Sequence, residues 1–119
     1  MRDFRNVKVW SKSHRLALDV YEASRKFPTD ERYCLTTQMR RSAASIPTNI
    51  AEGCGRGSEA DFARFLQIAA GSASELEYQL LLACDLKLLN EQIYEQLNRD
   101  VTEVKRMLYS FIATLKADR

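Results

Sequence analysis

The strongest constraint on the fold of this chain is an apolar stripe near its C-terminus. Seven apolar residues recur there at intervals of 4, 4, 3, 4, 3 and 4: Ile93, Leu97, Val101, Val104, Leu108, Phe111 and Leu115. This spacing puts all seven side chains on one face of an α-helix and is typical of helical bundles. The stripe therefore predicts a helix that packs against other helices.

Two further helices are predicted in the first half of the chain. The first runs from about Val9 to Lys26 and ends before Pro28, because proline disfavours α-helical geometry at the preceding residue. The second runs over about residues 31–52, with Thr29 or Asp30 as its N-cap. Its apolar stripe continues in phase beyond Pro47, so we expect a kink there. The expected core residues are Trp10, Ala17, Val20, Tyr21 and Phe27 in the first helix, and Leu35, Met39, Ala43, Ile46 and Ile50 in the second.

A third helix is predicted from about Ser58 to Leu89, with Ser58 as its N-cap. Gly71 lies in a run of small residues within this helix. Because glycine in a helix costs about 1 kcal/mol relative to alanine, we expect another backbone to approach closely there. The expected core stripe is Phe62, Leu66, Ala69, Ala73, Leu76, Leu80 and Ala83.

The third helix also carries a second apolar face, roughly opposite this stripe. A bundle helix normally has a polar outer face, so an apolar one requires another surface to cover it. Self-association is the favoured explanation, and extended packing within one copy is the alternative. The candidate oligomer interface comprises Ile68, Tyr78, Leu82, Leu86 and Leu89.

Composition supports an all-α class and a single domain over residues 1–119. The chain has only 4 Gly and 2 Pro, too few for the turns of an all-β domain. Short connections favour an antiparallel up-down-up-down four-helix bundle. No apolar run approaches the roughly 20 residues that span a bilayer, and no secretory signal is visible. We therefore expect a cytoplasmic protein without a membrane partner.

The sequence offers little for catalysis or metal binding. His14 is the only histidine, and the 3 cysteines form no Cys-x-x-Cys pair. A Ser-His-Asp triad would depend on this single imidazole, and no Gly-x-Ser-x-Gly motif is present. We expect no catalytic residue, no metal site, no cofactor and no enzymatic activity, with His14 on a helix surface or in an interface.

Basic residues are unevenly distributed. Residues 1–56 contain 11 Lys/Arg and 6 Asp/Glu, whereas residues 57–119 contain 7 and 10. The asymmetry permits a basic face that could contact phosphates. Salt bridges to Asp19, Glu22, Glu52 or Glu59 are the alternative. The candidate nucleic-acid-binding residues are Lys8, Lys12, Arg15, Arg40, Arg41, Arg56 and Arg64.

A polar face follows the apolar stripe of the second helix. Such residues usually form hydrogen bonds between helices and fix the packing. The face comprises Gln38, Ser42, Ser45, Asn49 and Glu52.

A set of residues that extends through nearly the whole chain matches the pattern of a known family. These residues are Val9-Trp10, Lys12, His14, Phe27-Pro28, Glu31, Leu35, Gln38, Arg40-Arg41, Ser45-Ile46-Pro47, Asn49-Ile50-Ala51-Glu52-Gly53, Phe62, Phe65-Leu66, Gly71-Ser72 and Glu75. With them the chain resembles the bacterial four-helix-bundle proteins encoded within intervening sequences of 23S ribosomal RNA genes. Cys34 stands where that family often has glycine, which puts the local backbone in question.

The resemblance implies a left-handed antiparallel four-helix bundle that assembles into a ring, typically a homopentamer. Related accessory proteins of diversity-generating retroelements form similar pentamers and bind nucleic acid and a reverse transcriptase. No catalytic residues come with the resemblance, and the ribosomal label reflects gene location. A partner that is itself a nucleic-acid enzyme is therefore one expectation.

Two functions follow as hypotheses. The leading one is a non-enzymatic, homo-oligomeric accessory protein that binds RNA or DNA through phosphate contacts. The alternative is a protein-interaction scaffold that makes no direct contact with nucleic acid.

Overall fold

The computed structural model describes residues 2–117, apart from the side chains at positions 32 and 33. Long α-helices make up most of this range: α1 (Lys8–Ser24), α2 (Thr37–Cys54), α3 (Glu59–Asp85) and α4 (Glu91–Ala117). Short 3₁₀ turns lie at Phe4–Asn6 and Thr29–Glu31, and a π-helical turn at Arg32–Thr36 leads into α2. The described range contains no β-strand, so the predicted all-α class is confirmed.

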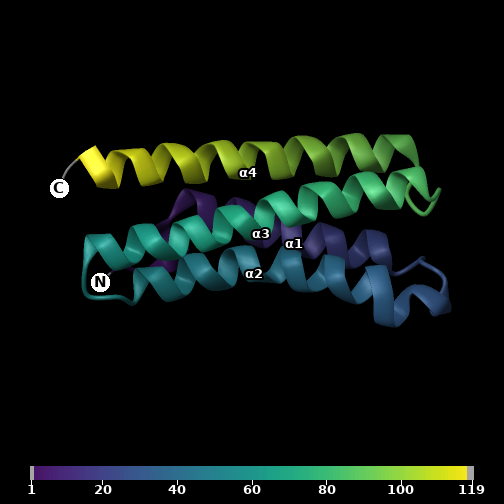
Figure 1. Ribbon diagram of the computed structural model, residues 1–119, viewed down its shortest axis with the longest axis horizontal. Helices are drawn as coiled ribbons and strands as arrows, with labels where there is room; N and C mark the ends of the chain where they lie inside the picture. Colours follow the sequence, from purple (N-terminus) through teal and green to yellow (C-terminus); the bar gives the residue numbers. More distant parts are fainter. Residues whose placement is uncertain (1, 118–119) are drawn as a thin grey trace.

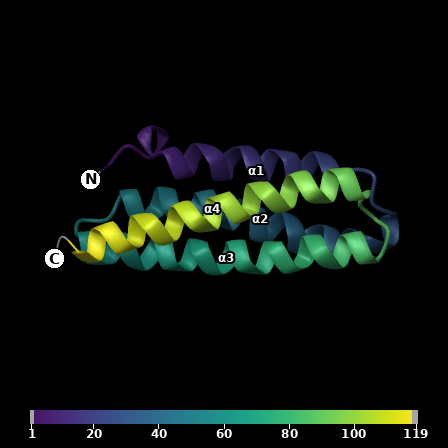
Figure 2. The ribbon, with the colours of Figure 1, turned by 90° about the horizontal axis from the view of Figure 1, so that it is seen from above.

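The four helices lie side by side along the long axis of the molecule, which measures 46 × 22 × 20 Å (Figure 1). Helix α2 packs against α1 and α3, and α4 packs against α3 and α1. Figures 1 and 2 both show the start of α1 and the end of α4 at the same end of the molecule. The prediction of four helices packed against one another is confirmed for the described residues.

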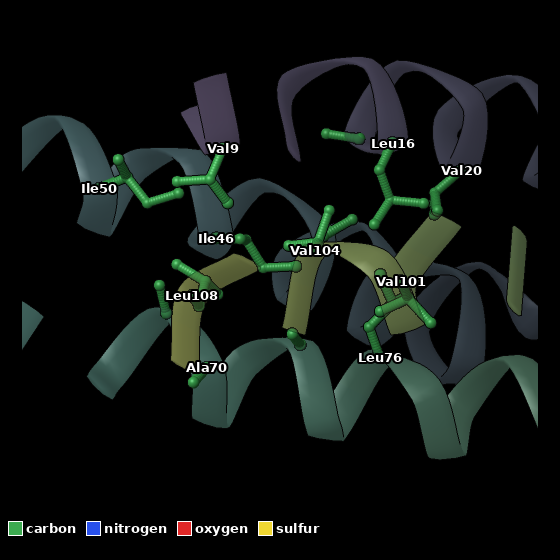
Figure 3. Close-up of a cluster of buried hydrophobic side chains, with 14 of the residues drawn as sticks. Val9, Leu16, Val20, Ile46, Ile50, Ala70, Leu76, Val101, Val104 and Leu108 are labelled. Atoms are coloured by element: carbon green, nitrogen blue, oxygen red, sulfur yellow. The ribbon is translucent and has the colours of Figure 1, made fainter. Parts of the chain in front are cut away.

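Helix α4 supplies most of its predicted stripe to the core. Figure 3 shows Val101, Val104 and Leu108 of α4 among apolar side chains from the other three helices. Ile93, however, is exposed, and Ile112 is buried in place of Phe111, which packs only at the edge of the core. A strict heptad pattern drifts by about 20° per heptad on a straight α-helix, so the buried positions shift along a long helix.

The predicted stripe of α1 was partly wrong. Three of its members are buried: Ala17, Val20 and Phe27. Trp10 is only half-buried, and Tyr21 is 43% exposed. Val9 and Leu16 enter the core instead (Figure 3). The reason is that α1 packs against both α2 and α4, so its buried face points between them, and Trp10 and Tyr21 lie at the edge beside α2.

Helix α2 buries its whole predicted stripe: Leu35 just before the helix, then Met39, Ala43, Ile46 and Ile50. Pro47 lies inside α2, which continues beyond it to Cys54, as the sequence predicted. Gly55 then forms the C-cap.

The start of α2 differs from the prediction. Regular α-helix begins at Thr37 rather than near residue 31, because the backbone of Cys34 leaves the helical region (φ −118°, ψ −106°). Thr29 and Asp30 lie in a separate 3₁₀ turn, in which the amide of Glu31 donates to the carbonyl of Pro28 at 3.0 Å. Neither residue therefore caps α2.

Helix α3 starts as predicted. The hydroxyl of Ser58 accepts a hydrogen bond from the backbone amide of Asp61 at 3.1 Å, which satisfies one of the free amides of the first turn. All seven predicted core residues of this helix are buried.

The end of α3 was predicted too late in the sequence. Helix α3 ends at Asp85, and Lys87 adopts a left-handed backbone with φ 66°. The amide of Leu88 donates to the carbonyl of Ala83 at 2.9 Å, and the amide of Lys87 donates to that of Cys84 at 3.0 Å. This pair of bonds defines a Schellman motif, which is usually formed with glycine at the left-handed position. The chain consequently turns back towards the bundle after α3.

Close contact between α2 and α3 explains why residue 53 is glycine but does not explain Gly71. A Cβ atom at Gly53 would lie 2.9 Å from both Phe62 Cδ1 and Phe65 Cβ, so the two helices approach closely there. At Gly71 a Cβ atom would meet no heavy atom within 4 Å. The predicted close approach at Gly71 is thus absent within one copy of the chain.

The helices can be compared with the requirements for a membrane-spanning segment. Within the described part of the chain, no helix has both the length and the apolar content required to cross a bilayer.

Candidate functional site

The three basic candidates at the start of α1 have different environments. Lys12 forms an ion pair with Glu103 of α4, with 3.0 Å between Nζ and Oε1. This hydrogen bond from Lys12 lowers the pKa of the Glu103 carboxyl below its usual value. Arg15 lies 3.9 Å from Asp19, and Lys8 has no ion-pair partner among the described residues.

Arg40 and Arg41 are adjacent in sequence but differ in their contacts. Arg40 Nε donates to Ser24 Oγ at 2.8 Å, and its Nη2 donates to the carbonyl oxygen of Tyr21 at 3.2 Å. Its guanidinium group also lies 4.9 Å from the centre of the Tyr21 ring. Arg41 is exposed and has no ion-pair partner in the part of the chain that the structure describes. Arg40 therefore links α2 to α1 through neutral groups, whereas Arg41 points into solvent.

Arg56 and Arg64 share one aromatic side chain. Their guanidinium carbons lie 4.7 and 4.6 Å from the centre of the Phe65 ring. Arg56 also pairs with Glu52 at 3.6 Å, and Arg64 pairs with Asp61 at 3.5 Å. Both arginines thus combine a cation–π contact with a surface ion pair.

The predicted alternative, salt bridging, accounts for much of the basic set. Each of the four carboxylates named as alternative partners forms an ion pair: Asp19 with Arg15, Glu22 with Arg25, Glu52 with Arg56, and Glu59 with Arg2. These pairs are solvent-exposed, and such pairs typically contribute about 0–1 kcal/mol. They are weak enough to exchange for other anions.

Only part of the predicted polar face of α2 forms hydrogen bonds. Ser45 Oγ and Ser72 Oγ lie 2.9 Å apart and join α2 to α3. Asn49 Nδ2 donates to the carbonyl of Ser45 at 2.8 Å and to its hydroxyl at 3.0 Å. Gln38 is exposed, and Glu52 turns towards Arg56. The bonds between α2 and α3 therefore centre on Ser45.

The predicted second apolar face of α3 is present over most of its length. Ile68 is 42% exposed, Tyr78 62% and Leu86 51%, while Leu82 is half-buried and packs against the core. Leu89 is a correction, because it lies beyond the end of α3 and is only 5% exposed. The turn at Lys87 carries Leu89 back onto the core. We name Ile68, Gly71, Tyr78, Leu82 and Leu86 the α3 outer face.

The structure also contains an apolar groove between α1 and α2 that the sequence did not predict. Its volume is about 380 Å³, and it is lined by Phe4, Trp10, His14, Ala17, Leu18, Tyr21, Ala44, Pro47, Thr48 and Ala51, which we name the α1/α2 groove. The rings of Trp10 and His14 are stacked with 4.9 Å between their centres, and Phe4 lies 4.7 Å from Trp10. Leu18 is 51% exposed in its wall.

A signal for this groove was present in the sequence. Trp10, His14 and Tyr21 recur at intervals of 4 and 7 residues, which places them on one side of a helix. The prediction assigned Trp10 and Tyr21 to the core, because both are large and apolar. The rotation of α1 about its own axis in the bundle turns Trp10 and Tyr21 away from the core and towards the groove.

Packing defines the surroundings of His14 and Cys54. His14 packs face to face on Trp10, as described above. Burial is the main cause that raises the pKa of the Cys54 thiol, with a smaller opposing effect from Arg2. Its sulfur is thus a poor nucleophile at neutral pH. No group of three His, Cys, Asp or Glu side chains within the described residues is placed to hold a metal ion.

Comparisons with known proteins agree with the resemblance seen in the sequence. The family model described as 23S rRNA-intervening sequence protein matches residues 5–110. A crystal structure of a protein of unknown function from the S23 ribosomal protein family of Bacteroides thetaiotaomicron is 33% identical to this chain, with a TM-score of 0.77. The similarity covers 87% of this chain and 97% of that one. No curated protein matches. The chain belongs to the 23S rRNA-intervening sequence protein family.

Proposed function

We propose that this protein is a non-enzymatic, homo-oligomeric binding protein. The observation that carries the proposal is the presence of two separate uncovered apolar surfaces, the α1/α2 groove and the α3 outer face. A monomer of this size usually exposes apolar residues singly, and contiguous apolar patches mark contacts with other molecules. Sedimentation velocity at micromolar concentration tests this directly. A protein that stays monomeric would contradict the proposal.

The assembly we propose is a cytoplasmic ring, with five copies as the expected number. Each copy would be a left-handed antiparallel up-down-up-down bundle. Support for this chain path comes from the short connections from α2 to α3 and from α3 to α4, and from the shared end at which α1 starts and α4 ends. The mass of the assembly, measured by light scattering, tests the number of copies.

The ligand we propose for this oligomer is RNA or DNA, held through phosphate groups. Three basic candidates have no carboxylate partner among the described residues: Lys8, Arg40 and Arg41. The others are held only by weak surface pairs, so phosphates could displace their carboxylates. A ring would also repeat every cation in each copy, and multivalent binding strengthens weak individual contacts.

The test is salt-dependent binding to structured RNA and to duplex DNA. The logarithm of the binding constant should fall with the logarithm of salt concentration, with about 0.9 units of slope per phosphate neutralised on duplex DNA. The double variant Arg40→Ala/Arg41→Ala, compared where sedimentation velocity shows an unchanged oligomeric state, should reduce both affinity and slope, whereas the control Lys26→Ala/Lys87→Ala removes two exposed cations elsewhere. Binding that is absent at low salt, or insensitive to salt, would rule out phosphate recognition.

A second candidate function is a protein-interaction scaffold without direct nucleic-acid contact. The exposed ion pairs favour it, because they already neutralise four of the basic candidates: Lys12, Arg15, Arg56 and Arg64. The partner class we propose for such a scaffold is a nucleic-acid enzyme. A purified complex that survives nuclease treatment and high salt would favour the scaffold, and one that dissociates under either treatment would favour nucleic-acid binding.

A further inference from the structure

The α1/α2 groove and the α3 outer face lie on different parts of the bundle. The groove lies between α1 and α2, whereas α3 packs against α2 and α4. Leu18 and Tyr21 expose 51% and 43% of their surface at the groove, and Tyr78 exposes 62% on α3. Two apolar surfaces that cannot meet within one copy are therefore available for a second copy.

The shapes of the two surfaces are complementary. The groove is hollow, and the α3 outer face is a helix with a low point at Gly71, where no heavy atom lies within 4 Å of a Cβ position. Glycine permits a close approach of another backbone, which compensates for its unfavourable helical propensity. The close contact that the sequence predicts at Gly71 is supplied by no other part of the described chain, so a second copy is the natural source.

The first part of the α3 outer face, from Ile68 to Tyr78, has the length of the groove. Trp10 and Tyr21 are 11 residues apart on α1, which corresponds to about 16 Å of helix. Ile68 and Tyr78 are 10 residues apart on α3, or about 15 Å. A helix whose apolar residues recur on one side is a common occupant of such a groove.

Among the described residues, the unpaired charges at the groove are positive and those within α3 from Ile68 to Asp85 are negative, whereas the unpaired cation Lys87 lies beyond the end of α3. Arg40 contacts Tyr21 of the groove but no carboxylate, and Arg41 precedes the groove residue Ala44 by one helical turn. On α3, Glu75 lies seven residues from both Ile68 and Leu82, and Asp85 lies seven residues after Tyr78. Neither carboxylate has a cationic partner within the described residues. Charge complementarity therefore favours a pairing between the groove and α3 over a pairing of either surface with itself.

We infer that the α1/α2 groove of one copy receives the α3 outer face of a second copy. This inference rests on the homo-oligomeric function proposed above and names the two surfaces that meet. Tyr78 and Ile68 enter the groove against Trp10, Leu18 and Tyr21, and Gly71 allows the close approach. Because the two surfaces differ, the contact runs head to tail, and it repeats until the assembly closes into a ring.

Two single variants test the inference by blocking one surface each. Leu18→Glu puts a carboxylate into the groove, where it repels Glu75 and Asp85 of the incoming helix. Gly71→Glu puts bulk and charge at the low point of α3. Both positions are exposed helix positions, so neither change should unfold a copy, and far-ultraviolet circular dichroism checks this. The matched control is Tyr109→Glu on α4, which places the same charge at a tyrosine that is 53% exposed and outside both surfaces.

Each blocking variant should weaken self-association by about 30-fold or more, as sedimentation velocity would show, while Tyr109→Glu should assemble like the original protein. The decisive experiment mixes the two blocked variants in equal amounts. The α3 outer face of Leu18→Glu is intact and fits the intact groove of Gly71→Glu. The remaining groove and α3 face both carry a new glutamate, so assembly should stop at a 1:1 dimer.

The outcomes separate the inference from the function on which it rests. If the original protein is monomeric, the homo-oligomeric function fails, and the inference fails with it. If the original protein assembles but either variant keeps its full assembly, the inference alone is overturned. If both variants dissociate and their mixture stays monomeric, the head-to-tail pairing is also overturned, because the mixture still contains one intact groove and one intact α3 outer face that should pair.

Discussion

Lys87, which follows α3 in a left-handed backbone conformation, allows a direct test of how this helix ends. Lys87 has φ 66°, a conformation that costs an L-amino acid with a side chain roughly 1–2 kcal/mol. The Schellman bonds of Leu88 to Ala83 and of Lys87 to Cys84 require this conformation. Glycine adopts it without steric cost, so Lys87→Gly should stabilise the protein.

The size of the effect is a difference between two terms. Relief of the left-handed conformation contributes about 1–2 kcal/mol. The greater freedom of glycine in the unfolded chain opposes it by roughly 0.5–1 kcal/mol. The net increase in the free energy of unfolding should be about 0.75 kcal/mol, the centre of a range of roughly 0–1.5 kcal/mol. With a urea dependence of about 2 kcal/mol per molar, the unfolding midpoint should rise by about 0.4 M.

The assay is urea unfolding followed by circular dichroism, with all proteins at the same concentration. Lys87→Ala is the control, because it removes the same side chain but keeps the cost of the left-handed backbone. Lys87 is exposed and has no ion-pair partner among the described residues, so this control should stay within about 0.5 kcal/mol of the original protein. If Lys87→Gly is no more stable than Lys87→Ala, the reasoning about the helix end is refuted.

Three further predictions concern the core and the thiols. Gly53→Ala should destabilise the protein by about 1–2 kcal/mol in urea unfolding, because the new methyl group would lie 2.9 Å from atoms of Phe62 and Phe65. This overpacking outweighs the gain in helix propensity. An unchanged or higher unfolding midpoint would contradict the prediction. A double-mutant cycle of Ser45→Ala and Ser72→Ala should give a coupling of roughly 0.5–1.5 kcal/mol, and additive effects would show that the 2.9 Å contact adds nothing. In the folded protein at pH 8, the exposed Cys34 should react quickly with Ellman's reagent. Cys54 should react only after unfolding, because burial raises the pKa of its thiol and keeps it protonated. Fast reaction of both thiols in the folded protein would refute this prediction.

The helical content and most of the core could be predicted from the sequence because apolar periodicity is a local property. The stripes of α2 and α3 are buried as predicted, since each lies on one side of a helix that faces the rest of the bundle. The prediction failed at the start of α2 and at the end of α3. At Lys87 no glycine marks the C-terminus, and the left-handed turn is stabilised by backbone bonds that the residue type does not announce.

The candidate surfaces were less predictable than the core. The exposure of Ile68 and Tyr78 on α3 followed from the second apolar face, but the groove was not predicted, although Trp10 and Tyr21 share one side of a helix. Trp10 and Tyr21 are large and apolar, and sequence alone assigns such residues to the core. Their position depends on how α1 is rotated between α2 and α4.

Apolar spacing along the chain is enough to specify four amphipathic helices, because it defines a face of each helix without reference to any other. How those faces are rotated against one another depends on the packing of the bundle. That rotation leaves Tyr21 outside the core, pairs Lys12 with Glu103, and opens Gly71 to solvent. Rotation depends on contacts between residues distant in the sequence, and no local pattern records those contacts.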